Sequence, residues 1–87
     1  MHVRRSDDDY VTKVVFRGHK TGRIITRYCA MEDRADATVE KCQHVALSNY
    51  FLWNQPERLV SIETKRRKDW LVLGVADVKQ SGTIKII

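Results

Sequence analysis

Apolar and polar residues alternate along two consecutive segments near the start of the chain, residues 10–17 and 23–30. A period of two is typical of β-strands with one buried face. Gly18 and Gly22 lie between the segments, and glycine readily takes the positive φ angles that tight turns require. We therefore predict a β-hairpin with its turn at residues 18–22.

The same alternation predicts which side chains share a face of this hairpin. On the second segment, Ile24, Thr26 and Tyr28 are predicted to face the core. One face of the hairpin would then carry a stripe of cations, namely Lys13, Arg17, Arg23 and Arg27.

Beyond the hairpin, apolar residues recur at spacings of three and four, which predicts an amphipathic helix. Asp33 or Asp36 is expected to cap its N-terminus, where a carboxylate also complements the positive end of the helix dipole. Pro56 is expected to end it, because proline disfavours helical geometry in the residue before it. The predicted core-facing stripe consists of Ala35, Val39, Cys42, Ala46, Tyr50 and Trp53.

Leu47 and Phe51 are one turn apart on the predicted opposite face of this helix. Two interpretations are open. Strands from the C-terminal half of the chain cover these side chains, or the two form an exposed apolar contact for a partner protein or for a second copy of the chain. The second interpretation allows a homodimer through the helix.

The C-terminal half of the chain predicts three further strands. Residues 58–64 alternate, residues 70–78 form a nearly continuous apolar run typical of a strand buried on both faces, and residues 83–87 follow another turn. The expected order is ββαβββ. This is an α+β fold in which one helix packs on one face of a mostly antiparallel sheet.

Residues 1–9 contain almost nothing to bury and are expected to form a mobile N-terminal tail, with residues 10–87 as a single α+β domain. The chain has no apolar stretch of the ~18 residues that a membrane span needs. It also begins without the apolar segment of a secretory signal. We therefore expect no membrane association, a cytoplasmic location and reduced thiols at Cys29 and Cys42.

Positive charge concentrates in two predicted turns, at residues 17–23 and 64–69. Sixteen Lys and Arg residues against eleven Asp and Glu residues give a net charge of +5, and the acidic clusters at residues 7–9 and 32–36 lie elsewhere in the sequence. Cationic turns suit contact with phosphates or with an acidic protein surface. The residues expected to contact nucleic acid are Arg17, His19, Lys20, Arg23, Lys65, Arg66, Arg67 and Lys68.

Candidate chemistry is sparse. The cysteine and histidine residues lack the spacing of metal sites, and nothing in the sequence activates a thiol, so we predict no catalytic residue, no metal and no cofactor. One alternative is a small metal-dependent nuclease. Pro56-Glu57 followed by Glu63-Thr64-Lys65 loosely resembles the Pro-Asp…Glu-x-Lys signature of restriction-type nucleases, in which two carboxylates hold Mg²⁺ and the lysine assists the attacking water.

The basic hairpin at residues 11–28 and the acidic-capped helix at residues 33–53 resemble small phage-encoded proteins in architecture and size. Some of those proteins inhibit host transcription and others block bacterial defence systems. The resemblance covers about half of the chain and includes no shared motif, so it assigns no functional residue. It implies stoichiometric occlusion of a partner's surface, although the basic charge departs from the acidic, DNA-mimicking members of that group.

The sequence thus predicts a non-catalytic module that binds nucleic acid through its cationic turns. A phage-type inhibitor is the main alternative. It would occlude an acidic surface of a host protein, with Leu47 and Phe51 as anchors. The nuclease, with Glu57, Glu63 and Lys65 as its active residues, is the third hypothesis.

Overall fold

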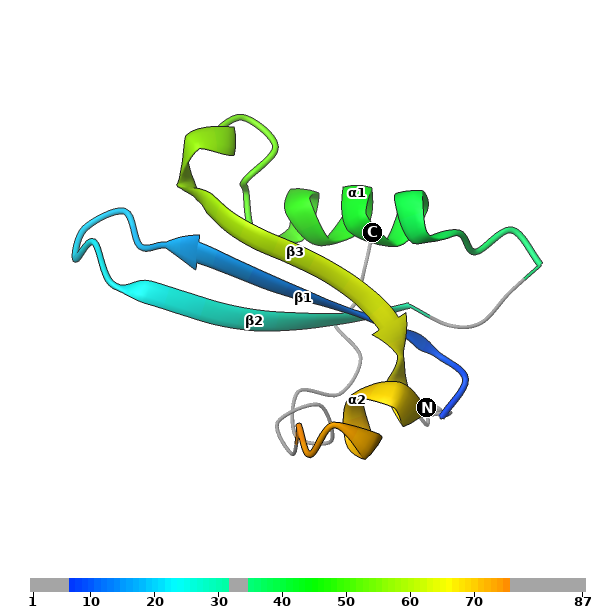
Figure 1. Ribbon diagram of the computed structural model, residues 1–87. Helices are drawn as coiled ribbons and strands as arrows, with labels where there is room; N and C mark the ends of the chain where they lie inside the picture. The colour runs from blue at the N-terminus through cyan, green and yellow to red at the C-terminus, as the bar shows by residue number, and fades with distance from the viewer. Residues whose placement is uncertain (1–6, 32–34, 76–87) are drawn as a thin grey trace, which may run out of the picture.

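The predicted hairpin forms the centre of the molecule. The computed structural model describes residues 7–31 and 35–75, and in it β1 (Tyr10–Arg17) pairs antiparallel with β2 (Ile24–Met31). A third strand, β3 (Leu59–Arg66), pairs antiparallel with the other edge of β1, so the strand order is β2-β1-β3. Figure 1 shows the three strands side by side, with the β1–β2 turn projecting at one end.

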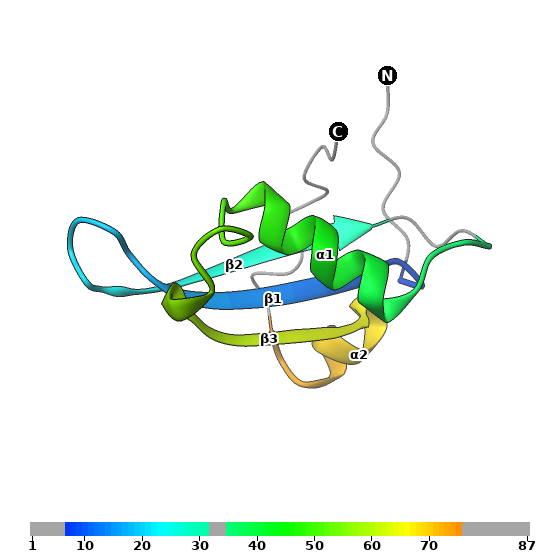
Figure 2. The same cartoon turned by 90° about the horizontal axis from the view of Figure 1, so that it is seen from above.

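One helix, α1 (Val39–Asn49), crosses a single face of this sheet (Figures 1 and 2). Its N-cap is Thr38, whose hydroxyl accepts a hydrogen bond from the Lys41 amide at 3.1 Å. The expectation that Asp33 or Asp36 caps the helix is wrong in the case of Asp36, which precedes the cap and forms an exposed ion pair with Lys41; Asp33 lies outside the described residues. The predicted α+β class, with one main helix on an antiparallel sheet, is confirmed.

Within the described residues, the hydrophobic core consists of two clusters on opposite faces of the sheet. Val14, Cys29, Ala46 and Leu52 form the larger cluster, between the sheet and α1. On the other face, at the end of the sheet where β1 begins, the buried residues are Val11, Tyr28, Ala30 and Trp70. The thin core expected of a short chain is therefore divided rather than single.

The segment after β3 is helical, which corrects two predictions. The end of β3 and α2 (Arg67–Val72) replace the expected hairpin turn at residues 64–69 and the described part of the expected strand at residues 70–78; residues 76–78 lie outside the described residues. An apolar run does not by itself distinguish a strand from a buried helix. Gly74 has φ +82° just beyond the helix, where glycine commonly ends helices. The predicted strand at residues 83–87 lies outside the described residues.

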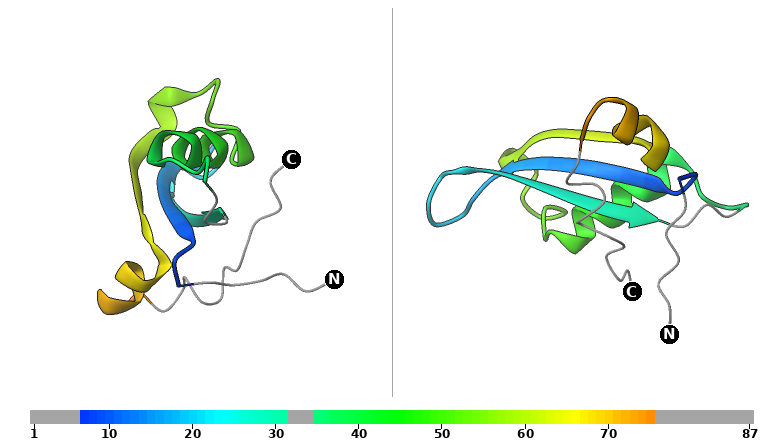
Figure 3. Two further views of the ribbon diagram at one scale, coloured as in Figure 1. Left: turned by 90° about the vertical axis from the view of Figure 1, so that its right-hand side faces the viewer. Right: turned by 90° about the horizontal axis from the view of Figure 1, so that it is seen from below.

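Trp70 anchors α2 to the sheet. Its side chain is 2% exposed, its indole Nε1 donates a 2.8 Å hydrogen bond to the Val11 carbonyl, and its ring meets the Tyr28 ring edge-on. In contrast, Val72 and Leu73 are exposed at the end of the helix. Figure 3 shows α2 on the sheet face opposite α1.

The register of the hairpin corrects the predicted cationic stripe. Antiparallel partners share a face of the sheet, and Val14 is paired with Arg27 whereas Lys13 is paired with Tyr28. Arg27 therefore lies on the α1 side of β2, and Lys13 lies on the other side. The loop between the strands sets the register, in which Arg17 is opposite Ile24. In this register Cys29 faces α1, and Tyr28, which was expected on that side, lies on the other face of the sheet.

Residues 7–9 are bonded to α2 instead of belonging to a free tail. The Asp7 and Asp9 carbonyls accept hydrogen bonds from the Lys68 and Arg67 amides at 2.9 and 2.8 Å, and Asp9 is buried. These bonds satisfy amide groups that the first turn of a helix leaves without intrahelical partners. Residues 1–6 of the predicted tail lie outside the described residues. Among the helices that are described, none is long and apolar enough to span a membrane.

Candidate binding surface at the turn end of the sheet

The two basic clusters lie at opposite ends of β1. Arg17 ends β1 at the β1–β2 turn, whereas Tyr10 begins it opposite Arg66, the last residue of β3. Eight residues of strand separate the clusters, a distance of roughly 24 Å at about 3.4 Å per residue. The eight residues expected to contact nucleic acid therefore do not lie side by side on one surface.

The β1–β2 turn is closed by its own main chain. The Gly18 amide donates to the Arg23 carbonyl at 2.7 Å, and the Gly22 amide donates to the Gly18 carbonyl at 3.1 Å. Gly22 takes φ +67°, which favours glycine. A Cβ at Gly18 would lie 3.0 Å from the Ile25 Cδ1 atom, so a larger residue there would have to displace that side chain. The turn thus holds its polar side chains on a defined loop.

The cations of this turn are exposed and uncompensated. We call Arg17, Lys20 and Arg23 the turn cations; their side chains and that of His19, which lies among them, are all exposed. The Arg17 guanidinium donates to the Gly22 carbonyl at 3.2 Å, which orients it without neutralising its charge. Within residues 7–31 and 35–75, the ion pairs involve other cations and none of these three.

At the opposite end, the α2 cluster (Lys65, Arg66, Arg67 and Lys68) is largely engaged within the molecule. Lys65 pairs with Glu63 at 3.4 Å and lies over the Trp70 ring at 5.1 Å. Lys68 pairs with the Asp8 carboxylate at 3.3 Å. The acidic Asp7–Asp9 segment is far from this cluster in the sequence, but it folds back onto it in the structure.

The two arginines of the α2 cluster serve the fold. The Arg66 guanidinium stacks 3.9 Å from the centre of the Tyr10 ring and donates to the Asp8 carbonyl at 2.6 Å. Arg67 is only 3% exposed at the start of α2. Because its side chain is buried, Arg67 is not an exposed contact for a phosphate.

Leu47 and Phe51 do not share a helix face, because α1 ends at Asn49. The Leu52 amide donates to the Leu47 carbonyl at 2.9 Å and the Phe51 amide donates to the Ser48 carbonyl at 3.1 Å. This is the Schellman pattern, and it places Phe51 in the left-handed region at φ 59°. Leu47 is half-buried against the core, whereas Phe51 is 83% exposed.

Trp53 is a second exposed aromatic residue near the end of α1, and the sequence did not predict its exposure. Trp53, which was predicted to face the core, is 55% exposed, and its ring meets the His44 ring edge-on at 4.2 Å. Trp53 borders a shallow apolar hollow of about 170 Å³ together with Leu47, Leu52, Pro56 and Leu59. Pro56 correctly indicates that the helix ends before residue 56. The helix in fact ends at Asn49, so Trp53 lies beyond it and not on its core-facing side.

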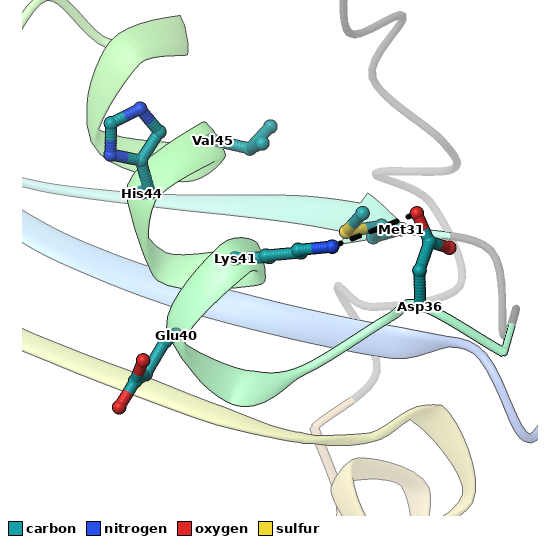
Figure 4. A pocket seen from close by; sticks show the side chains of 6 residues that line it. All are labelled: Met31, Asp36, Glu40, Lys41, His44 and Val45. Atoms are coloured by element: carbon teal, nitrogen blue, oxygen red, sulfur yellow. Dashed lines mark ion pairs between the residues drawn. The ribbon is translucent and has the colours of Figure 1, made fainter.

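A larger depression of about 450 Å³ lies at the other end of α1. Figure 4 shows Met31 and Val45 beside it, the Lys41–Asp36 ion pair across it, and Glu40 pointing away from Asp36. The divergence of the two carboxylates does not suit a cation. Among the described residues, no three His, Cys, Asp or Glu side chains are placed to hold a metal ion.

The nuclease residues are not gathered into a site either. Glu57 lies in the 3₁₀ turn η1 (Pro56–Arg58), before β3 begins, and Glu63 pairs with Lys65 along β3. The thiols of Cys29 and Cys42 are both free and buried, and burial raises the pKa of each above its ordinary value. A raised pKa disfavours the nucleophilic thiolate.

Comparison with known proteins adds no assignment. No protein-family model matches the chain, and neither the curated proteins nor the solved structures include a significant match.

Proposed function

We propose that this protein is a non-catalytic module that binds nucleic acid through the β1–β2 turn. The observation that carries the proposal is the set of exposed turn cations without carboxylate partners in the described chain. Lysine and arginine neutralise phosphates and release condensed counterions, which provides most of the free energy of non-specific binding. The reduced state of the two thiols fits action in the cytoplasm.

The geometry reduces the number of phosphates that the protein would contact. Arg17, Lys20 and Arg23 carry a full charge at neutral pH, whereas the α2 cluster is engaged at the far end of the sheet. Three phosphate contacts give a slope of about −3 in a plot of log affinity against log salt concentration for duplex DNA. Engagement of both clusters would give a much steeper slope.

The test is a pair of double variants with equal net charge. Lys20→Gln/Arg23→Gln removes two turn cations, and Lys41→Gln/Lys68→Gln removes two exposed lysines that are paired with Asp36 and Asp8. We expect the first variant to lose at least tenfold in affinity for a fluorescent oligonucleotide at 50 mM salt, and the second to lose less than threefold. Equal losses, or no binding by the wild-type chain, would contradict the proposal.

The same cations support a second candidate, namely an inhibitor that occludes an acidic surface of a partner protein, as the phage-encoded proteins do. Exposed cations accelerate association with an acidic surface. In that case the turn variants would lose binding to the partner protein, and the wild-type chain would show no salt-dependent affinity for DNA or RNA.

A further inference from the structure

Phe51 is an unusual residue for its position. It is the first residue beyond the cap of α1 and takes φ 59°, where helices most often have glycine because a Cβ clashes with the backbone. Its ring is 83% exposed, so packing within the described chain does not compensate the strain. A bulky aromatic group at a position that favours glycine points to a role outside folding.

Trp53 presents a second aromatic surface two residues later. Its indole contacts the His44 ring edge-on, and the ring remains 55% exposed beside the apolar hollow. Trp70, the other tryptophan, is buried at the far end of the sheet. Phe51 and Trp53 are therefore two exposed aromatic residues, separated by a single residue, in the loop after α1.

This loop lies at the same end of the sheet as the turn cations. The Tyr50 ring stacks on the Phe16 ring at a centroid distance of 6.0 Å, and Phe16 is paired with Leu59 at the start of β3. Phe16 directly precedes Arg17, the first of the turn cations. Figures 1 and 2 show both the turn and the segment between α1 and β3 at this end, away from α2.

We propose that the nucleic acid bound by this protein is single-stranded, with unstacked bases resting on Phe51 and Trp53 while the turn cations hold the phosphates. This inference rests on the proposed function and specifies its ligand class. Proteins that bind single strands without sequence preference combine a cationic surface with exposed aromatic rings, because every base has a face that stacks. A duplex keeps its bases stacked internally and offers them to neither ring.

Charge complementarity also sets the orientation of the strand. The C-terminal end of α1 carries partial negative charge, so phosphates favour the turn and the neutral bases favour the Phe51 side. The hollow beside Trp53, at about 170 Å³, is smaller than the ~300 Å³ at which small-molecule pockets begin. A flat stacked base needs only the ring faces and not an enclosed pocket.

The test uses Phe51→Gly, which removes the ring and relieves the backbone. We expect the full-length variant to bind a 20-nucleotide thymidine oligomer about tenfold more weakly than the wild-type chain. Its affinity for a 20-base-pair duplex should be unchanged. Val72→Ala is the matched control, because Val72 is equally exposed, at 84%, but lies at the opposite end of the sheet. This control should bind both oligonucleotides as the wild type does.

Fluorescence gives an independent readout. Stacking of a base on Trp53 should quench its emission, and Trp53→Phe should abolish the quenching while it preserves most of the single-strand affinity. Wild-type affinity of Phe51→Gly for the single strand would overturn the inference. If Lys20→Gln/Arg23→Gln nevertheless weakened oligonucleotide binding in that case, the proposed function would stand without the single-strand inference. If Phe51→Gly abolished binding to an acidic protein but left single-strand binding intact, the single-strand inference would be overturned in favour of docking on a protein.

Discussion

At the scale of single residues, the fold uses the backbone of Phe51 but not its side chain. The hydrogen bonds that end α1 come from the Phe51 and Leu52 amides, and Leu52 is the buried side chain that secures the chain beyond the helix. The ring of Phe51 contributes little to this arrangement because it is mostly in solvent. The sequence predicts that Leu47 and Phe51 share one helix face. It contains no glycine near the end of α1 that would indicate a residue in the left-handed conformation.

Replacing Phe51 by glycine should therefore stabilise the protein. Phe51→Gly removes a left-handed strain of about 1–2 kcal/mol and introduces about 0.5–1 kcal/mol of backbone entropy. We expect the free energy of unfolding in urea to rise by about 0.5–1 kcal/mol. Phe51→Ala, which keeps a Cβ, should give no such gain. A loss of stability in the glycine variant would mean that the ring packs against part of the chain.

The buried thiols predict a pH dependence. Burial raises the pKa of Cys29 and Cys42 above the ~8.5 of a free thiol, so the unfolded chain releases these protons at lower pH than the folded chain does. Their contribution to stability is fully present below about pH 8.5 and is lost as the pH rises through the folded values. We expect urea midpoints to fall as the pH rises above about 8.5.

A thiol reagent provides the control for this prediction. At pH 8, modification of Cys29 and Cys42 should be slow in the folded protein and become rapid in urea. Fast modification without denaturant would contradict the burial of both side chains.

At the scale of elements, the sequence predicted those segments whose pattern is local. The alternation of β1 and β2, the two glycines of their turn and the stripe containing Cys42 and Ala46 identified the hairpin and α1. The ends of the helix were misplaced, because Asp33, Asp36 and Thr38 all satisfy the capping rule and only tertiary packing selects among them. The same holds for α2, where Trp70 is buried by contact with β1, far away in sequence.

The choice of cap is testable. Thr38→Ala removes the acceptor for the Lys41 amide and should lower the free energy of unfolding by about 1 kcal/mol. Asp36→Ala removes only one partner of an exposed ion pair, and such pairs contribute about 0–1 kcal/mol. Urea denaturation of both variants checks the order. A larger effect at Asp36 would place the start of the helix earlier than Val39.

At the scale of the whole molecule, the distribution of charge matters more than its sum. The sequence revealed the net charge of +5 and both basic clusters, but it did not reveal that β1 separates them. Nor did it reveal that Asp8 reaches Lys68, because the partners are 60 residues apart in the chain. The part of the candidate site that was predicted, the turn cations, is the part that depends only on a local hairpin.

Two single substitutions with the same change in net charge test this distribution. His19→Lys adds a charge in the turn, and Asp8→Asn removes a carboxylate beside Lys68. We expect His19→Lys to raise oligonucleotide affinity several-fold at 50 mM salt and to steepen the duplex salt slope by about 0.9. Asp8→Asn should change either quantity much less. Equal effects would mean that only net charge governs binding.

The position of the β1–β2 turn at the tip of the sheet has a further consequence. A protein held by its tip stands on a polymer rather than lying along it, so each copy covers few nucleotides. Saturation should then occur at a high ratio of protein to polynucleotide, and this stoichiometry is measurable even where the affinity is low.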